Sequence, residues 1–165
     1  MKNLLILILF FSFNQLISQE KIGINDVYYE NYLAYKISND KLFSGILQKF
    51  RKNGHLVYDE IYESGILIKT TLYLNGKGKP APFKVILYHE KTFTPKTEIE
   101  YRKPPYVEYT HFDINGVKTL NEVYTNDILT YQCKYVNGKK NGVEFCINDD
   151  GTKTVKEYIN GKKIK

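Results

Sequence analysis

The amino-acid sequence predicts an all-β protein, an elongated antiparallel sheet built from successive β-hairpin repeats that follow a cleaved signal peptide. Three observations support this fold class. The 165 residues include 15 Tyr and 9 Phe, and aromatic residues favour strands. The dipeptide Asn-Gly recurs along the chain, and it is typical of tight turns between antiparallel strands. Segments that contain it also repeat at a fixed spacing, which indicates a repeat architecture.

Residues 1–18 have the composition of a secretory signal peptide. Lys2 gives a positive start, residues 4–13 are apolar apart from Ser12, and a more polar stretch ends at Ser18. We expect cleavage after Ser18 and a single domain over residues 19–165. The protein is then exported, to a periplasmic, outer-surface or extracellular location. The apolar run is too short to span a bilayer and no later run is longer, so no transmembrane segment is expected.

The clearest internal repeat has an offset of 62 residues. Successive Asn-Gly turns within each copy lie 22 residues apart, about the length of one hairpin. The matched positions are Phe50 with Phe112, Asn53-Gly54 with Asn115-Gly116, Glu60 with Glu122, Tyr62 with Tyr124, and residues 73–77 with 135–139. The pattern of residues 135–139 occurs a third time at residues 158–162.

The strands are expected between these turns. Strand-like runs lie at residues 67–74, 85–88, 128–136 and 143–147. Asn-Gly turns are expected at residues 53–54, 75–76, 115–116, 137–138, 141–142 and 160–161. Residues 26–35 fit a helix and a strand equally well. Residues 77–108 fit the repeat poorly and contain Pro104-Pro105, so we treat them as a diverged central unit.

A common pattern runs through these units: Gly followed by an aromatic residue near the fifth position, then Asn-Gly, then Tyr-x-x-Gly. It begins at Leu33-Ala34-Tyr35-Lys36 and Leu42-Phe43-Ser44-Gly45, continues through Gly76, and resumes from Tyr109 to Lys163. This pattern resembles the variant MORN repeat (membrane occupation and recognition nexus) of many bacterial chains. Departures from it are Asp127 where Gly is expected, and the absence of Trp; Leu47 and Glu144 stand near the Trp position.

The resemblance implies an elongated sheet of hairpins with a role in protein interaction or surface attachment, and it supplies no catalytic residues. Bacterial proteins with this pattern are often catalogued as YwqK-type antitoxins. An exported protein is in the wrong compartment to neutralise a cytosolic toxin. We therefore do not adopt the antitoxin-like activity as an expectation.

Two strand registers decide whether Cys133 and Cys146 meet. A two-residue loop at Lys139-Lys140 places the cysteines directly opposite each other, where they could form a disulfide. Disulfides are common in exported proteins. A three-residue loop instead joins Tyr131, Cys133 and Tyr135 to the apolar face of residues 143–147 and sends Cys146 to the other face. We favour the three-residue loop with two unlinked thiols, because it keeps the apolar residues together; the disulfide remains the alternative.

The sequence assigns no catalytic, cofactor-binding or metal-binding residues, so we do not expect an enzyme. The three histidines are isolated, and only His111 has a carboxylate, that of Asp113, on its own strand face. Glu98 and Glu100 share a strand face as a glycosidase pair would. Their spacing is also that of ordinary solvent-facing strand residues. An enzyme is therefore a weaker interpretation than a protein-interaction module or a surface-attachment protein.

Two sets of side chains are candidates for surface binding. Lysines follow the recurrent turn, and equivalent repeat positions stack along a solenoid, so they are expected to form a positive line on one edge: Lys77, Lys139, Lys140, Lys162 and Lys163. Lysines at hairpin tips also prevent unwanted strand pairing, which is the structural alternative. Among tyrosines outside the repeat register, Tyr106 and Tyr109 are candidates for exposed contacts. The matched Tyr62, Tyr73, Tyr124, Tyr135 and Tyr158 are expected to form a ladder on one face, mostly in the core.

These features favour an exported, non-enzymatic β-repeat protein that acts as a protein–protein interaction or scaffold module, with a partner protein or envelope component that the sequence leaves unidentified. The alternative is attachment to anionic lipid headgroups or polysaccharide through the lysine edge and exposed tyrosines. The formal net charge of +6, to which Lys2 contributes one unit, suits such surfaces. Nucleic acid is not expected as a partner, because the chain is exported and contains only two Arg.

Overall fold

The computed structural model describes residues 19–76, 78–103 and 105–165. In this part of the chain twelve strands form one sheet, and β2 and β3 form a separate hairpin. The strands are β1 (Lys21–Gly23), β2 (Val27–Glu30), β3 (Leu33–Lys36), β4 (Gly45–Phe50), β5 (Leu56–Glu63), β6 (Ile66–Tyr73), β7 (Pro82–Tyr88), β8 (Pro95–Tyr101), β9 (Tyr106–Phe112), β10 (Lys118–Thr125), β11 (Ile128–Val136), β12 (Lys139–Ile147), β13 (Lys153–Ile159) and β14 (Lys162–Lys163).

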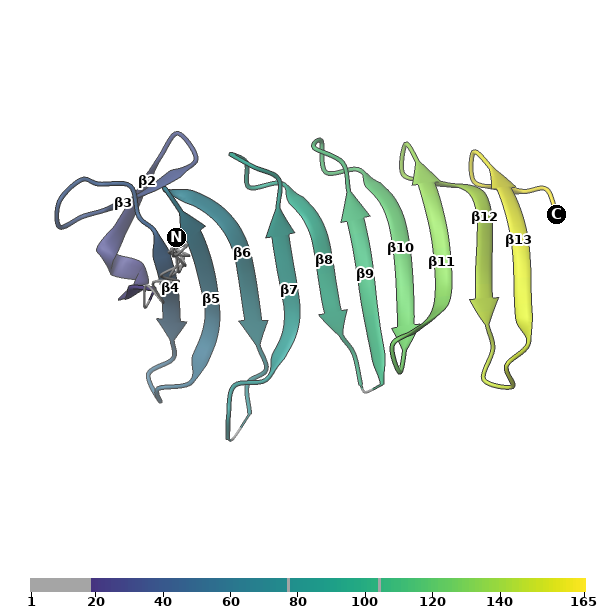
Figure 1. The fold of residues 1–165 in the computed structure, drawn as a ribbon, viewed down its shortest axis with the longest axis horizontal. Helices are drawn as coiled ribbons and strands as arrows, with labels where there is room; N and C mark the ends of the chain where they lie inside the picture. The colour runs from purple at the N-terminus through teal and green to yellow at the C-terminus, as the bar shows by residue number, and fades with distance from the viewer. Residues whose placement is uncertain (1–18, 77, 104) are drawn as a thin grey trace, which may run out of the picture.

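The sheet confirms the predicted all-β fold of successive hairpins. From β4 to β14 each strand pairs antiparallel with the next one in the chain, and β1 adds to β4 as a parallel strand. The strands therefore stand side by side in chain order, with the N-terminal hairpin at one end and the C-terminus at the other (Figure 1). The signal peptide predicted for residues 1–18 lies outside the described residues.

Residues 26–35, which fitted a helix and a strand equally, form the end of a short 3-10 turn (Ile24–Asp26) and then the β2–β3 hairpin. Within the described residues no helix is long and apolar enough to cross a membrane.

Left-handed backbone conformations turn the chain between strands. Asn137 and Gly138 have φ values of 51° and 72° and form the two-residue connection between β11 and β12. Two consecutive positive φ values are the geometry that matches the twist of a β-hairpin. Asp127 also has a positive φ, 63°, between β10 and β11. Asp tolerates this conformation, so the turn survives where the repeat pattern expects Gly.

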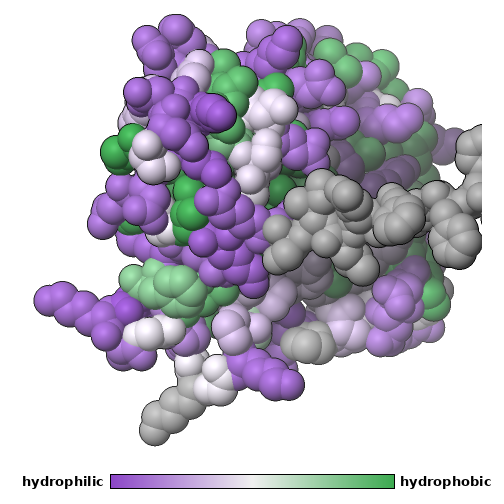
Figure 2. All heavy atoms as spheres, turned by 60° about the vertical axis from the view of Figure 1, so that its left-hand side comes forward, coloured by the Kyte–Doolittle hydropathy of each residue, from purple (hydrophilic) through white to green (hydrophobic). Residues whose placement is uncertain are grey.

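The β2–β3 hairpin covers one face of the sheet and creates the main core. Val27 and Ala34 from the hairpin pack with Leu47, Tyr62 and Leu67 of the sheet, and Phe43 completes the buried cluster. We call this side of the sheet the hairpin face; further along, it carries Tyr88, Glu108 and Glu144. Around β2 and β3, hydrophobic groups are scattered among hydrophilic ones in the surface view (Figure 2).

The opposite side of the sheet, which we call the open face, is defined by one row of cross-strand neighbours. The strand registers place Val85, Ile99, Tyr109, Glu122, Gln132, Phe145 and Val155 in this row. No other described element covers the open face, and from β8 to β14 the hairpin face is also uncovered. Most of the sheet is therefore a single layer.

The matched tyrosines do not form the predicted ladder on one face. Tyr62, Tyr135 and Tyr158 lie on the hairpin face, whereas Tyr73 and Tyr124 lie on the open face. Equivalent strands of the two copies of the 62-residue repeat, such as β4 and β9 or β5 and β10, are five strands apart, so they run in opposite directions. The second copy is turned over relative to the first, and each matched side chain changes face.

The β11–β12 register also differs from both predicted registers. The turn lies at Asn137-Gly138, and β12 runs through residues 139–147 with an irregularity near the predicted second turn at residues 141–142. The preferred three-residue loop is wrong, because Cys133 pairs with Glu144 and Cys146 pairs with Tyr131. Both cysteines therefore lie on the hairpin face, two positions out of register, and both are free thiols.

This arrangement predicts unequal thiol reactivity. Cys133 is 1% exposed, whereas Cys146 is only partly buried. Because access limits thiol reaction, one thiol per chain is expected to react with an aromatic disulfide reagent in buffer and two in denaturant. If neither thiol reacted in denaturant without reductant, a Cys133–Cys146 disulfide would be present and the register above would be wrong.

Candidate functional site

Three of the candidate lysines lie together at one end of the sheet. Lys139 begins β12, and Lys162 and Lys163 form β14. The two turns that precede these strands are adjacent, because the Gly161 amide donates to the Lys140 carbonyl at 2.8 Å. All three side chains are exposed, and none takes part in an ion pair among the described residues. They form a positive cluster at the β12 to β14 end of the sheet, with Lys139 and Lys162 on the open face and Lys163 on the hairpin face, and this cluster is shorter than the predicted line.

Lys140 has a different environment from these three lysines. Its ammonium group donates to Glu144 and lies 5.2 Å from the centre of the Tyr158 ring. The hydrogen bond to Glu144 raises the pKa of Lys140, and the nearby carboxylate charge adds to this effect. Lys140 is therefore paired within the sheet. Lys77, the remaining candidate, lies outside the described residues.

Glu144 is the centre of a buried polar cluster on the hairpin face. Its side chain is 7% exposed, and it accepts hydrogen bonds from Tyr131 at 2.9 Å and Tyr158 at 3.1 Å in addition to Lys140. Burial favours a higher pKa for the Glu144 carboxyl. The hydrogen bonds outweigh burial and hold the pKa below its usual value. Each carboxylate oxygen has a donor, so this cluster is suited to holding β11, β12 and β13 together.

The two candidate tyrosines lie on opposite faces of β9. Tyr106 is on the hairpin face and 42% exposed. Tyr109 is on the open face, where its ring meets that of Tyr124 edge-on at 5.4 Å. The structure therefore does not bring Tyr106 and Tyr109 into one surface.

Tyr109 and Tyr124 line a shallow hollow on the open face, of about 500 Å³, together with His111 and Glu122. His111 Nε2 lies 3.6 Å from a Glu122 oxygen, and His111 Nδ1 is 3.1 Å from the Thr97 hydroxyl. Sequence reasoning paired His111 with Asp113, but Asp113 instead accepts backbone hydrogen bonds within the β9–β10 turn. Among the described residues no group of three or more His, Cys, Asp or Glu side chains is placed to hold a metal ion.

Glu98 and Glu100 are neutralised by a shared cation. Lys84 lies 2.8 Å from Glu98 and 3.3 Å from Glu100. The chain continues this ladder on the hairpin face through Arg102, which pairs with Glu108. Two carboxylates that share a lysine belong to a surface charge ladder, and the arrangement gives no support to a glycosidase pair.

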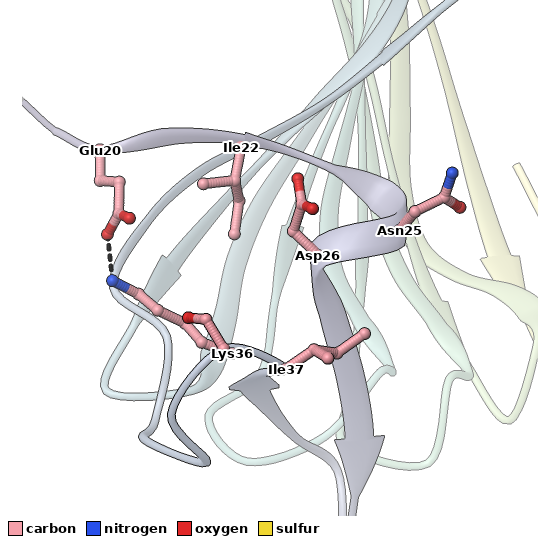
Figure 3. Close-up of a pocket in the computed structure, with 7 residues that line it drawn as sticks. Glu20, Ile22, Asn25, Asp26, Lys36 and Ile37 are labelled. Carbon is pink, nitrogen blue, oxygen red and sulfur yellow. Dashed lines mark hydrogen bonds and ion pairs between the residues drawn. The ribbon is translucent and has the colours of Figure 1, made fainter.

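A further pocket, of about 300 Å³, lies beside the first strand (Figure 3). Glu20 and Lys36 form an ion pair across its mouth, and Ile22, Asp26 and Ile37 line the rest. The Asp26 carboxylate has a structural role, because it accepts a hydrogen bond from the Gly23 amide at 2.9 Å. The polar groups of this pocket thus hold the N-terminal segment against the β2–β3 hairpin.

Comparison of the chain with family models, curated proteins and solved structures gave no match.

Proposed function

We propose that this protein is an exported, non-enzymatic binding module whose open face contacts a partner protein. The observation that carries the proposal is the single-layer sheet with two chemically different faces. From β7 onward the hairpin face holds charged groups that form ion pairs with one another, such as Lys84 with Glu98 and Arg102 with Glu108. The open-face positions of β7, β8, β9 and β12 are mainly aliphatic and aromatic, and between them Glu122 of β10 accepts a hydrogen bond from Gln132 of β11.

The open face leaves large apolar side chains in solvent. The exposed fractions of Phe83, Tyr101, Val143 and Val155 are 37%, 43%, 53% and 55%. Large exposed apolar patches on soluble proteins commonly mark interaction sites, and interface centres are enriched in aromatic residues and poor in charge. A protein partner with a broad apolar surface fits this face better than a small substrate does.

The test is a photo-crosslinking experiment in cells that export the protein. A photoreactive phenylalanine analogue is placed at Tyr109 or at Thr110, neighbours on β9 that point to opposite faces and are both half-buried. The proposal predicts a discrete protein adduct from position 109 and little or none from position 110. Equal adducts from both positions, or no adduct from either, would contradict a partner on the open face.

Attachment to an anionic polymer or lipid is the second candidate function. The observation that favours it is the cluster of Lys139, Lys162 and Lys163, exposed and outside the ion pairs of the described residues. Charge-driven binding weakens as salt rises. Flotation with anionic vesicles at low salt, lost at high salt and lost when all three lysines are changed to Gln, would support attachment. Binding that is unaffected by high salt and by the three Gln substitutions would exclude this cluster as the attachment site.

The resemblance to variant MORN repeats implies the same kind of interaction role. Membership of that family, and export through a signal peptide at residues 1–18, remain parts of this proposal.

A further inference from the structure

A separate cavity lies on the hairpin face, where the β2–β3 hairpin approaches the sheet. Its volume is about 320 Å³, within the range of small-ligand sites. Segments far apart in the sequence form its walls: β2, the β5–β6 hairpin, the end of β7 and the β7–β8 loop. The lining residues are Tyr29, Glu60, Tyr62, Leu67, Tyr88 and Phe93.

The aromatic rings form walls around this cavity and do not stack flat on one another. Tyr29 meets Phe93 at an interplanar angle of 83° and Tyr62 at 45°, with ring centres 6.4 Å apart in both pairs. Tyr32, at the tip of the β2–β3 hairpin, leans on Phe93 with ring centres 5.5 Å apart. Tyr29 and Phe93 are 50% and 43% exposed, so the cavity opens to solvent between them.

Glu60 supplies the only carboxylate among the lining residues. One of its oxygens accepts a hydrogen bond from Tyr62 at 2.9 Å, and Tyr62 also shares a hydrogen bond with Tyr29 at 3.1 Å. The other Glu60 oxygen has no hydrogen bond and no ion pair among the described residues. Burial raises the pKa of Glu60, and no lysine or arginine opposes this effect. Among the described residues, this carboxylate therefore has no cationic partner.

We propose that this aromatic cage binds an organic cation, specifically a quaternary ammonium group. The faces of aromatic rings attract cations, and cages of such rings recognise quaternary ammonium ligands. Glu60 adds a full negative charge at the wall, and Leu67 adds apolar contact for methyl groups. A quaternary ammonium group also has no N–H donors that need acceptors. The hydroxyls of Tyr62 and Tyr88 already bond to Glu60 and Thr70, so the rings and the Glu60 carboxylate are what the cavity offers to a cation.

This site is independent of the proposed partner surface. The cage lies on the hairpin face near the N-terminal end, whereas the partner surface lies on the open face. Failure of one proposal therefore leaves the other standing.

The first test compares choline with dimethylbutanol, a neutral molecule of nearly the same shape in which carbon replaces the charged nitrogen. Both are titrated into the protein, purified after export of the full chain, and followed by isothermal calorimetry and by NMR of the tyrosine rings. Choline is expected to bind about tenfold more tightly than dimethylbutanol and more tightly than the primary amine ethanolamine. Equal binding of choline and dimethylbutanol, tighter binding of ethanolamine, or no saturable binding of choline would overturn the proposal.

Two substitutions locate the binding to the cage. Phe93→Ala removes an exposed wall and Glu60→Gln removes the charge at nearly constant shape, and each is expected to weaken choline binding about fivefold or more. Phe83→Ala is the matched control, because Phe83 is similarly exposed, at 37%, but lies on the open face. Thermal melts establish that each variant is folded. Folded Phe93→Ala and Glu60→Gln proteins that bind choline normally would place the site elsewhere and overturn the assignment.

The source of the ammonium group is settled by flotation with phosphatidylcholine vesicles. Flotation that free choline competes away would support binding of a lipid headgroup. Binding of free choline without flotation would support a soluble ligand.

Discussion

Substituting Gly65 by Ala is expected to lower the free energy of unfolding by about 3 kcal/mol or more. Gly65 is buried in the β5–β6 turn and has a φ of +79°. An added Cβ would lie 2.7 Å from Leu42 Cδ2 and 3.0 Å from the Ala34 carbonyl oxygen. The Gly65 carbonyl also accepts the Ala34 amide at 2.8 Å. The substitution therefore strains the backbone and separates the β2–β3 hairpin from the sheet.

Gly138 provides the matched control for this prediction. It has a similar φ, +72°, in the β11–β12 turn, but an added Cβ would meet no atom of the described residues within 4 Å. Gly138→Ala is therefore expected to cost about 1 kcal/mol, from backbone strain alone. Urea denaturation of both variants measures the difference. Equal losses would show that the β2–β3 hairpin does not press on Gly65.

Replacing Glu144 by Ala is expected to lower the free energy of unfolding by about 2 kcal/mol. The carboxylate is buried and accepts hydrogen bonds from Tyr131, Tyr158 and Lys140. Without it the partly buried Tyr131 hydroxyl loses its acceptor, and β11, β12 and β13 lose their common contact. Lys140 is partly exposed, so its ammonium group can be hydrated when Glu144 is removed. The loss of stability is therefore smaller than for a fully buried ion pair.

Glu63→Ala is the control substitution, at an exposed glutamate of β5 outside the ion pairs of the described residues. It is expected to change the free energy of unfolding by less than about 0.5 kcal/mol.

The pH dependence of stability gives a second check on Glu144. The folded-state pKa of Glu144 is lowered from 4.5, so its contribution is present above that value and is lost as the pH falls. The stability difference between wild type and Glu144→Gln should shrink between about pH 6 and about pH 3. A constant difference would contradict the role of the carboxylate.

Most turns and strands could be predicted because their signals are local, although Asn141-Gly142, predicted as a turn, lies inside β12. Asn137-Gly138 and Asn160-Gly161 have positive φ values at both residues, as a tight hairpin requires. The run predicted at residues 128–136 coincides with β11. Such features depend on the conformational preference of two or three neighbouring residues, which the sequence states directly.

The assignment of side chains to faces could not be predicted in the same way. It depends on counting every strand between two positions, and the poorly matching residues 77–108 conceal β7 and β8, so that equivalent strands of the two copies lie five strands apart. An odd number of strands turned the second repeat over and divided Tyr62 from Tyr124. Similarly, a turn two residues earlier than expected, together with the irregularity that follows it in the β11–β12 ladder, placed Cys133 opposite Glu144.

The candidate sites were predicted least well, because they depend on contacts between distant segments. The repeat pattern singled out Glu144 only as a residue near a missing Trp, and the structure makes it the acceptor of three side chains. Nothing local connects Tyr29 with Glu60 or Phe93. Their meeting requires the β2–β3 hairpin to fold back on the sheet, which no turn signal or strand period specifies.

Solvent access to the two faces of β9 tests the single-layer sheet most directly. Tyr109→Cys and Thr110→Cys are made separately in a chain with Cys146→Ser, and a water-soluble maleimide is applied in buffer. The buried Cys133 serves as the internal standard for an unreactive thiol. The single-layer sheet predicts that both new thiols react at similar rates and much faster than Cys133. Protection of position 109 to the level of Cys133 while position 110 reacts quickly, in the isolated protein, would contradict an open face that is accessible to solvent.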